Sequence, residues 1–129
     1  MYLLSNIVEQ ITAKNKATDA KTECKPSMPV EHLIIYNSSV DDEQTRKAAQ
    51  IGVDVLDKIP GVRATWRGEA VKSEAQYQWC WLIRFANESV IPSYRDHPDH
   101  VAYANEQFRP IAGNRVSIDY ALLGPESNS

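Results

Sequence analysis

Two kinds of hydrophobic periodicity alternate along the chain from residue 31 onward. Residues 32–37 form a short, continuously apolar run, which predicts a strand that is buried on both faces. Apolar and polar positions alternate through residues 77–85, and two weaker runs, 62–71 and 115–123, also favour strands. One face of the 77–85 strand is expected to carry the large side chains Tyr77, Trp79, Trp81, Ile83 and Phe85.

The first of two helical segments lies between the first and second strands. Asp41 is placed to cap its N-terminus, with Gln44 three residues later, and Pro60-Gly61 stops it. Its apolar stripe, which we expect to pack on a sheet, consists of Ala48, Ile51, Val55, Leu56 and Ile59.

The second helical segment, between the third and fourth strands, is interrupted. Residues 88–96 begin it, and Pro98 restarts it at the favoured first helical position, with Asp96 or His97 as the cap. Its predicted apolar stripe consists of Val101, Ala104 and Phe108.

The order strand, helix, strand, strand, helix, strand indicates an α+β, ferredoxin-like βαββαβ fold. Two helices cover one face of a four-stranded antiparallel sheet in this arrangement. We expect the other face to carry Trp79 and Trp81, and an apolar patch of this kind on a monomer marks association. The sequence therefore predicts a homodimer that pairs through its sheet faces.

The first 29 residues form an extension with a different pattern. Apolar positions between Tyr2 and Ile11 predict a short amphipathic helix, which docks on the domain, frays, or covers a sheet edge or a partner subunit. Residues 14–29 are typical of a polar linker. The folded domain is expected over residues 30–123, followed by a tail at 124–129.

Composition narrows the class of protein. The chain has 129 residues, 43% of them hydrophobic, which suits one globular domain. A net charge of -3 argues against nucleic-acid binding, and no apolar run approaches the roughly 18 residues of a membrane span. Two cysteines, Cys24 and Cys80, are too few for a disulfide scaffold, and the N-terminus lacks the pattern of a signal peptide, so we expect a cytoplasmic protein.

Candidate chemistry gathers in the second helical segment and the last strand. His97 and His100 lie one helical turn apart. Asp119 lies within an apolar strand and needs a hydrogen-bond partner, for which His100 is the most economical candidate. A carboxylate-oriented His100 is suited to remove a proton next to a carbonyl, while Tyr94 hydrogen-bonds the developing enolate oxygen.

Each of these candidate catalytic residues is also explained by a purely structural role. His97 before Pro98 is suited to cap a helix, the Asp119–His100 pair to pin helix to sheet, and Tyr94 to pack in the core. The His97-x-x-His100 spacing with nearby aspartates also offers ligands for zinc or copper. The same spacing is typical of a helix start, so we expect no metal and no cofactor.

Several segments together resemble the stress-responsive A/B barrel family over about residues 30–123. They are VEHLIIYN at 30–37, IPGV at 59–62, YRDHPDHV at 94–101 and VSIDY at 116–120. The resemblance implies a dimeric α/β barrel built on the ferredoxin-like unit. It does not imply a particular activity, because most members have none assigned.

One plant member of the family is a polyketide cyclase that performs an aldol condensation without metal or organic cofactor. The resemblance places its catalytic His, Tyr and supporting Asp on His100, Tyr94 and Asp119, and a pocket His on His32. Two further pocket positions differ, because a His of the cyclase falls on Trp79 and a Tyr falls on or near Gly52.

Two functions follow as hypotheses. The first is a dimeric protein that holds a small apolar ligand in a pocket between sheet and helices, lined by His32, Trp79, Trp81 and His97. The alternative is a cofactor-independent lyase or cyclase that acts on a carbonyl or phenolic, polyketide-like substrate through Tyr94, His100 and Asp119. An open cavity that reaches His100 favours the enzyme, and a tightly filled one favours the first hypothesis.

Overall fold

The structure, a computed structural model, describes residues 28–124. The predicted N-terminal helix, most of the linker including Cys24, and residues 125–129 of the tail lie outside the described residues.

Four strands and two helical segments follow one another in the predicted order. The elements are β2 (Val30–Asn37), α2 (Asp42–Leu56), β3 (Val62–Glu69), β4 (Trp79–Phe85), α3 (Val90–Asp96), α4 (Pro98–Tyr103), a π-helical turn η3 (Ala104–Phe108) and β5 (Asn114–Ala121). The strands form one antiparallel sheet in the order β3-β4-β2-β5. This arrangement confirms the ferredoxin-like α+β fold.

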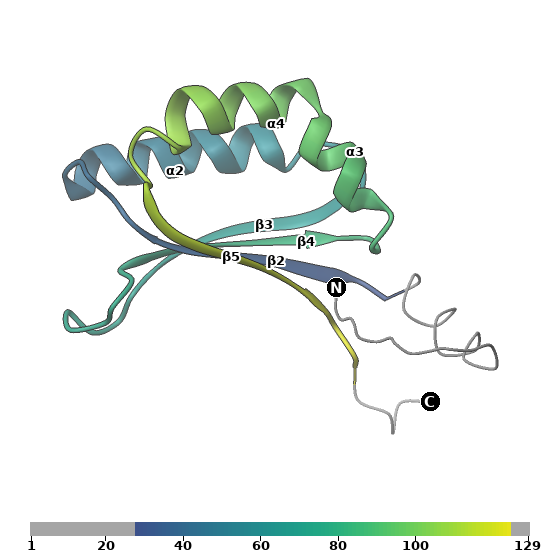
Figure 1. Ribbon diagram of the computed structural model, residues 1–129, viewed down its shortest axis with the longest axis horizontal. Coiled ribbons are helices and arrows are strands. Elements are labelled where there is room, and N and C mark those ends of the chain that lie inside the picture. The colour runs from purple at the N-terminus through teal and green to yellow at the C-terminus, as the bar shows by residue number, and fades with distance from the viewer. Residues whose placement is uncertain (1–27, 125–129) are drawn as a thin grey trace.

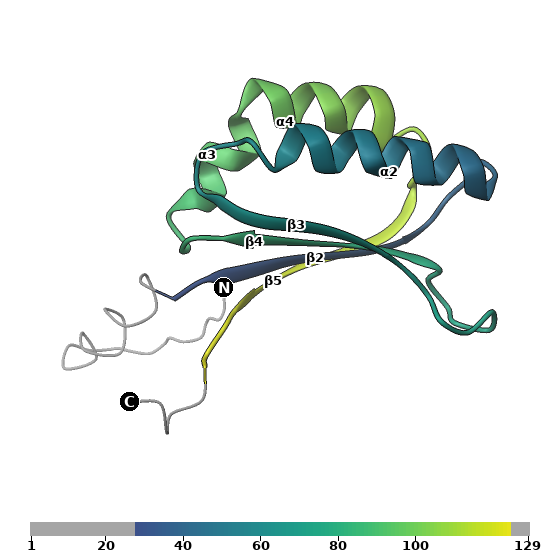
Figure 2. The same ribbon diagram turned by 180° about the vertical axis from the view of Figure 1, so that it is seen from behind.

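The helices lie together on one face of the sheet. Figures 1 and 2 show α2 and α4 side by side above the strands, with α3 at one end. No described element covers the opposite face. We call this uncovered side the open sheet face.

Turns and caps explain where α2 begins and ends. The Asp41 carboxylate accepts the Gln44 N–H at 2.8 Å, which confirms the predicted N-cap. After α2, Gly61 adopts a φ of 92°, which side chains rarely tolerate, and its carbonyl accepts the Ala86 N–H at 2.8 Å. The Pro60-Gly61 pair therefore redirects the chain from the helix into β3.

The buried face of α2 differs from the predicted stripe. Ile51 is 42% exposed, while the buried residues of α2 are Thr45, Ala49, Gly52 and Leu56. Small residues on this face let the helix approach the sheet closely. Leu56 and Ile59 of the predicted stripe are buried as expected, and Ile51 is the member that the structure contradicts.

The second helical segment matches its predicted stripe in part. Ala104 and Phe108 are buried as predicted, while Val101 is exposed and Tyr103 is buried in its place. A π turn follows Tyr103, in which the Arg109 N–H bonds the Ala104 carbonyl five residues back at 2.8 Å. The wider turn brings Phe108 onto the same side as Tyr103.

The prediction that Trp79 and Trp81 lie on the uncovered face is wrong. Both are buried beneath the helices, and the Trp81 ring meets those of Tyr103 and Phe108 edge to face at 6.2 and 6.4 Å. Alternation correctly grouped the large residues of β4 on one face. It could not show that this face is the one the helices cover.

A different set of apolar residues occupies the open sheet face. The strand register places Trp66, Leu82, Leu33 and Ile118 in one row across all four strands. The next row contains Gly68, Cys80, Ile35 and Val116. Trp66 is 47% exposed and Ile118 is 40% exposed, so the sheet presents a broad apolar surface to solvent.

Candidate functional site

One row of the sheet carries the polar residues of the site on its helix-covered side. The register places His32 of β2 beside Ile83 of β4 and opposite Asp119 of β5. The His32 Nδ1 lies 2.5 Å from the Asp119 Oδ1. Asp119 therefore has the partner that an acidic group in an apolar strand requires, but this partner is His32 and not His100.

His100 is held by the backbone of the preceding helix. Its Nδ1 lies 3.0 Å from the carbonyl oxygen of Arg95. That carbonyl is free because the Asp99 N–H, which would bond it in a continuous helix, instead bonds the His97 Nδ1 at 3.1 Å. The break at His97-Pro98 thus confirms the helix-capping role for His97 and also provides the acceptor for His100.

Both imidazoles have one ring nitrogen fixed by an oxygen that accepts hydrogen bonds. A carbonyl and a carboxylate only accept, so the Nδ1 of His100 and the Nδ1 of His32 each carry a proton. In the neutral rings the Nε2 atoms are then the basic nitrogens. The two histidines therefore share the same tautomer, with His32 on strand β2 and His100 on helix α4.

Tyr94 of α3 lies between the two histidines. Its ring centroid is 4.5 Å from that of His100, 4.7 Å from that of Phe85 and 6.2 Å from that of His32. Within residues 28–124 its hydroxyl makes no hydrogen bond, and it is not among the fully buried atoms without a partner. Burial first, and then the nearby Tyr103 and Asp119, raise the pKa of Tyr94, so the phenol keeps its proton.

The charge state of His100 is set by its surroundings. Burial lowers the pKa of His100 below the ordinary 6.5, and the charges of Arg109 and His32 act in the same direction against the Arg95 hydrogen bond. The ring is therefore neutral near pH 7. A neutral imidazole can accept a proton from a bound molecule.

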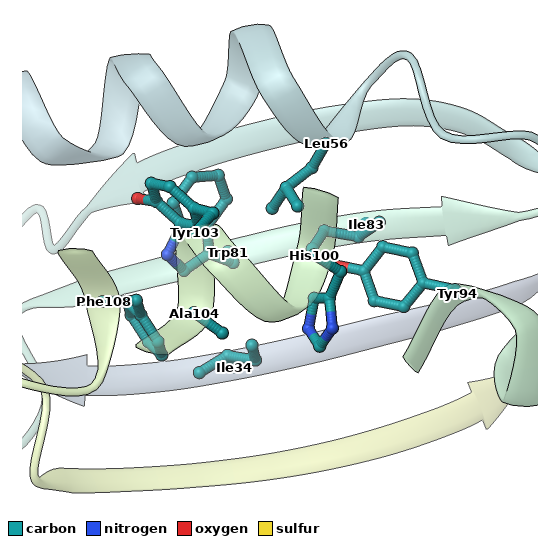
Figure 3. Close-up of a pocket in the computed structure, with 9 residues that line it drawn as sticks. All are labelled: Ile34, Leu56, Trp81, Ile83, Tyr94, His100, Tyr103, Ala104 and Phe108. Carbon is teal, nitrogen blue, oxygen red and sulfur yellow. The ribbon is translucent and has the colours of Figure 1, made fainter. Parts of the chain in front are cut away.

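A small cavity begins beside these residues. It has a volume of about 30 Å³. Figure 3 shows His100 and Tyr94 at one end of the cavity and Tyr103, Trp81 and Phe108 at the other. We call it the His100 pocket, and its full lining is Ile34, Leu56, Trp81, Ile83, Tyr94, His100, Tyr103, Ala104 and Phe108. A space of this size has room for roughly two water-sized groups, so the cavity next to His100 is nearly filled.

The remaining predicted site residues lie in different places. Trp81 lines the His100 pocket, while Trp79 lines a separate polar hollow of about 250 Å³ beside the N-terminus of α2. In that hollow Glu69 is already held by Arg46, through two hydrogen bonds of 2.8 Å. His97 faces the Asp99 amide and lines neither space.

Tyr103 is a pocket residue that the sequence pattern did not single out. It is buried, lies three residues after His100, and donates its hydroxyl to the Ala48 carbonyl of α2 at 2.5 Å. The available signal was the spacing of Tyr103 from His100, one helical turn along α4.

In residues 28–124, His, Cys, Asp and Glu side chains form no cluster of three or more that is suited to a metal ion. No helix in this range has the length and apolar character to span a bilayer.

Fold and site together define a ferredoxin-like α+β protein with a histidine- and tyrosine-lined pocket between sheet and helices. Residues 30–122 match the model of the Stress responsive A/B Barrel Domain, and the chain belongs to this family. Comparison with curated protein sequences gave no match.

Solved structures with the same fold include proteins of known and unknown function. A family member from Mesorhizobium loti is 22% identical, with a TM-score of 0.68 over 75% of this chain and 99% of that one. A dimeric ferredoxin-like protein of unknown function from Thermobifida fusca is 22% identical, with a TM-score of 0.65 over 74% and 92%. A hydroxynitrile lyase from Passiflora edulis is 16% identical, with a TM-score of 0.66 over 78% and 98%.

Proposed function

We propose that this protein binds a small, partly apolar carbonyl molecule at the His100 pocket. The Tyr94 side chain carries this proposal, because the residue is buried at the edge of an apolar cavity while its hydroxyl stays accessible and has no partner within residues 28–124. A ligand oxygen that accepts from Tyr94, or donates to the free nitrogen of His100, would satisfy these groups. The apolar part of the ligand would lie against Ile34 and Ile83.

Titration with small ligands tests this binding directly. Propanone is added to the full chain while the imidazole and tyrosine signals are followed by NMR. We expect saturable shifts at His100 and Tyr94, with binding at least tenfold weaker in His100→Ala. The control variant Arg46→Ala alters the polar hollow at the other end of the sheet and should leave the shifts unchanged. Absence of saturable shifts with propanone would exclude a binding pocket here.

We further propose that the protein is a homodimer in which the open sheet faces of two copies meet. The rows that contain Trp66, Leu82 and Ile118 form an apolar surface with no cover among the described residues. Structurally similar proteins from Thermobifida fusca, Bacteroides fragilis and Jannaschia are described as dimeric. A stable pair of this kind buries about 1,600 Å² in total.

Sedimentation tests the dimer independently of any ligand. The full chain should sediment at twice 14.6 kDa at micromolar concentration. A monomer at that concentration would contradict pairing through the open sheet face.

A second candidate function is cofactor-independent acid–base catalysis, favoured by the neutral His100 beside the protonated Tyr94. The Nε2 of His100 accepts a proton from the carbon next to a carbonyl. The electron pair moves onto the carbonyl oxygen, which accepts a hydrogen bond from Tyr94. Such general-base catalysis contributes roughly 10²- to 10⁴-fold in rate. The similar hydroxynitrile lyase supports a lyase reaction.

Proton exchange tests catalysis without knowledge of the natural substrate. The protein is incubated with propanone in deuterium oxide, and loss of the protons next to the carbonyl is followed by NMR. Catalysis predicts exchange above the buffer rate, with at least a hundredfold loss in His100→Ala. Exchange at the buffer rate, together with saturable propanone binding, would leave binding as the function and exclude this catalysis.

A further inference from the structure

Tyr103 occupies the inner end of the His100 pocket. Its buried ring projects from α4, and its hydroxyl donates to the Ala48 carbonyl on α2 at 2.5 Å. The ring also meets Trp81 edge to face at 6.2 Å. The side chain is therefore fixed at both ends, and it fills space that would otherwise extend the cavity between the two helices (Figure 3).

Gly52 makes this placement possible. A Cβ added at Gly52 would lie 2.6 Å from both Cζ and Oη of Tyr103, and still closer to the Trp81 ring. These distances are too short for atoms in contact, so any larger residue at this position would displace one of the rings. Because Gly52 has no side chain, α2 leaves a small recess, which we call the notch, and the Tyr103 ring occupies it.

The position of Tyr103 relative to His100 links the notch to the site. The two residues lie three apart on α4 and both line the cavity. With the Tyr103 ring in place, the space beyond His100 measures about 30 Å³. That volume admits a methyl or a carbonyl group but not an aromatic ring.

We propose that Tyr103 is the residue that sets the size of molecule the His100 pocket accepts, and that its natural ligands are short-chain carbonyl compounds with a methyl-sized buried end. This inference rests on the proposed binding function of the pocket. It names Tyr103 as a specificity-determining residue because its ring occupies the volume into which a larger ligand would extend. Aromatic ligands would enter only when that ring is removed.

Phenol is the probe that tests this proposal, since it reproduces the removed side chain. The chain contains 3 tryptophans, so ¹⁵N-tryptophan labelling gives separate indole N–H signals, and that of Trp81 reports entry into the inner end of the pocket. In Tyr103→Ala we expect phenol to shift the Trp81 signal with at least tenfold tighter binding than in the unaltered protein. Tyr103→Phe keeps the ring and should therefore still exclude phenol from the Trp81 end of the pocket.

Two further variants keep the experiment decisive. Ile59→Ala opens the core at a buried residue that does not line the pocket, and it should gain no phenol binding at Trp81. Tyr103→Leu removes only part of the ring and should give a smaller gain if Tyr103→Ala does not fold. Equal phenol binding by the unaltered protein and folded Tyr103 variants, or an equal gain in Ile59→Ala, would overturn the role of Tyr103.

The propanone titration of the unaltered protein separates this proposal from the binding function on which it rests. If propanone fails to shift His100 but Tyr103→Ala takes up phenol at Trp81, the proposed binding function and the short-chain ligand class fail, although the ring still blocks the space. If propanone binds and phenol reaches Trp81 in the unaltered protein, only the size limit fails.

Discussion

The carboxylate of Asp119 bonds the Nδ1 of His32 at 2.5 Å, directly across the β2–β5 strand pair. The register of two neighbouring strands fixes this contact, and no helix takes part in it. His100, on α4, is oriented instead by the Arg95 carbonyl. The site therefore has two imidazoles that are held independently, one by the sheet and one by a helix end.

Replacement of Asp119 by Asn tests which histidine depends on the carboxylate. We expect the strongly hydrogen-bonded imidazole N–H signal of His32 to disappear or move upfield, while the His100 signals change little. Because the Asp119 side chain is 40% exposed, the free energy of unfolding should fall by only about 1 kcal/mol. Imidazole NMR and urea unfolding measure the two effects. A large change at His100 with none at His32 would restore the pairing expected from the sequence.

The lowered pKa of His100 predicts how stability depends on pH. The folded protein disfavours the charged ring, so below the ordinary pKa of 6.5 the unfolded chain binds more protons at this residue than the folded one. The contribution of His100 therefore lowers the free energy of unfolding as the pH falls below 6.5, and it is flat above that pH. Melting temperatures from pH 5 to 8 should fall less steeply at the acidic end in His100→Gln than in the unaltered protein. Parallel curves for the two proteins would contradict this prediction.

The fold was accessible from the sequence, as was the nearness of Tyr94 to His100, while the partner of Asp119 was not. Strand periodicity, the Asp41 cap and the His97-Pro98 break are local signals, and each produces its structure within a few residues. The partner of Asp119 depends on the register between strands 87 residues apart, which no local pattern encodes. The sequence analysis chose His100 as the partner of Asp119, but the strand register places His32 opposite Asp119 instead.

One position in the predicted apolar stripe of each helical segment, Ile51 and Val101, was mispredicted for a related reason. Ile51 is more hydrophobic than Gly52, yet the buried position is Gly52, because a ring from α4 fills the space beside it. The π turn that brings Phe108 beside Tyr103 likewise has no periodic signature. Packing between elements, rather than the hydrophobicity of one element, determined these positions.

Two tyrosine-to-phenylalanine substitutions should have different effects on stability. The Tyr103 hydroxyl donates to the Ala48 carbonyl, so Tyr103→Phe should lower the free energy of unfolding by about 1 kcal/mol. The Tyr94 hydroxyl has no partner within residues 28–124, so Tyr94→Phe should change it by less than about 0.5 kcal/mol. Tyr94→Phe should instead weaken propanone binding. Urea unfolding separates the two variants, and equal losses of stability would contradict the assignment of the Tyr94 hydroxyl to a ligand.

The open sheet face offers a matched pair of substitutions for the proposed dimer. Ile118 on the open sheet face and Ile51 on the outer side of α2 are similarly exposed, at 40% and 42%. An aspartate at Ile118 would be buried between two copies without a partner, which costs several kcal/mol, so Ile118→Asp should weaken dimerisation on the order of 100-fold or more. An aspartate at Ile51 stays in water and should leave the dimer intact. Sedimentation equilibrium of both variants measures the difference. If Ile51→Asp yields monomers and Ile118→Asp does not, then the dimer forms through the helices rather than through the open sheet face.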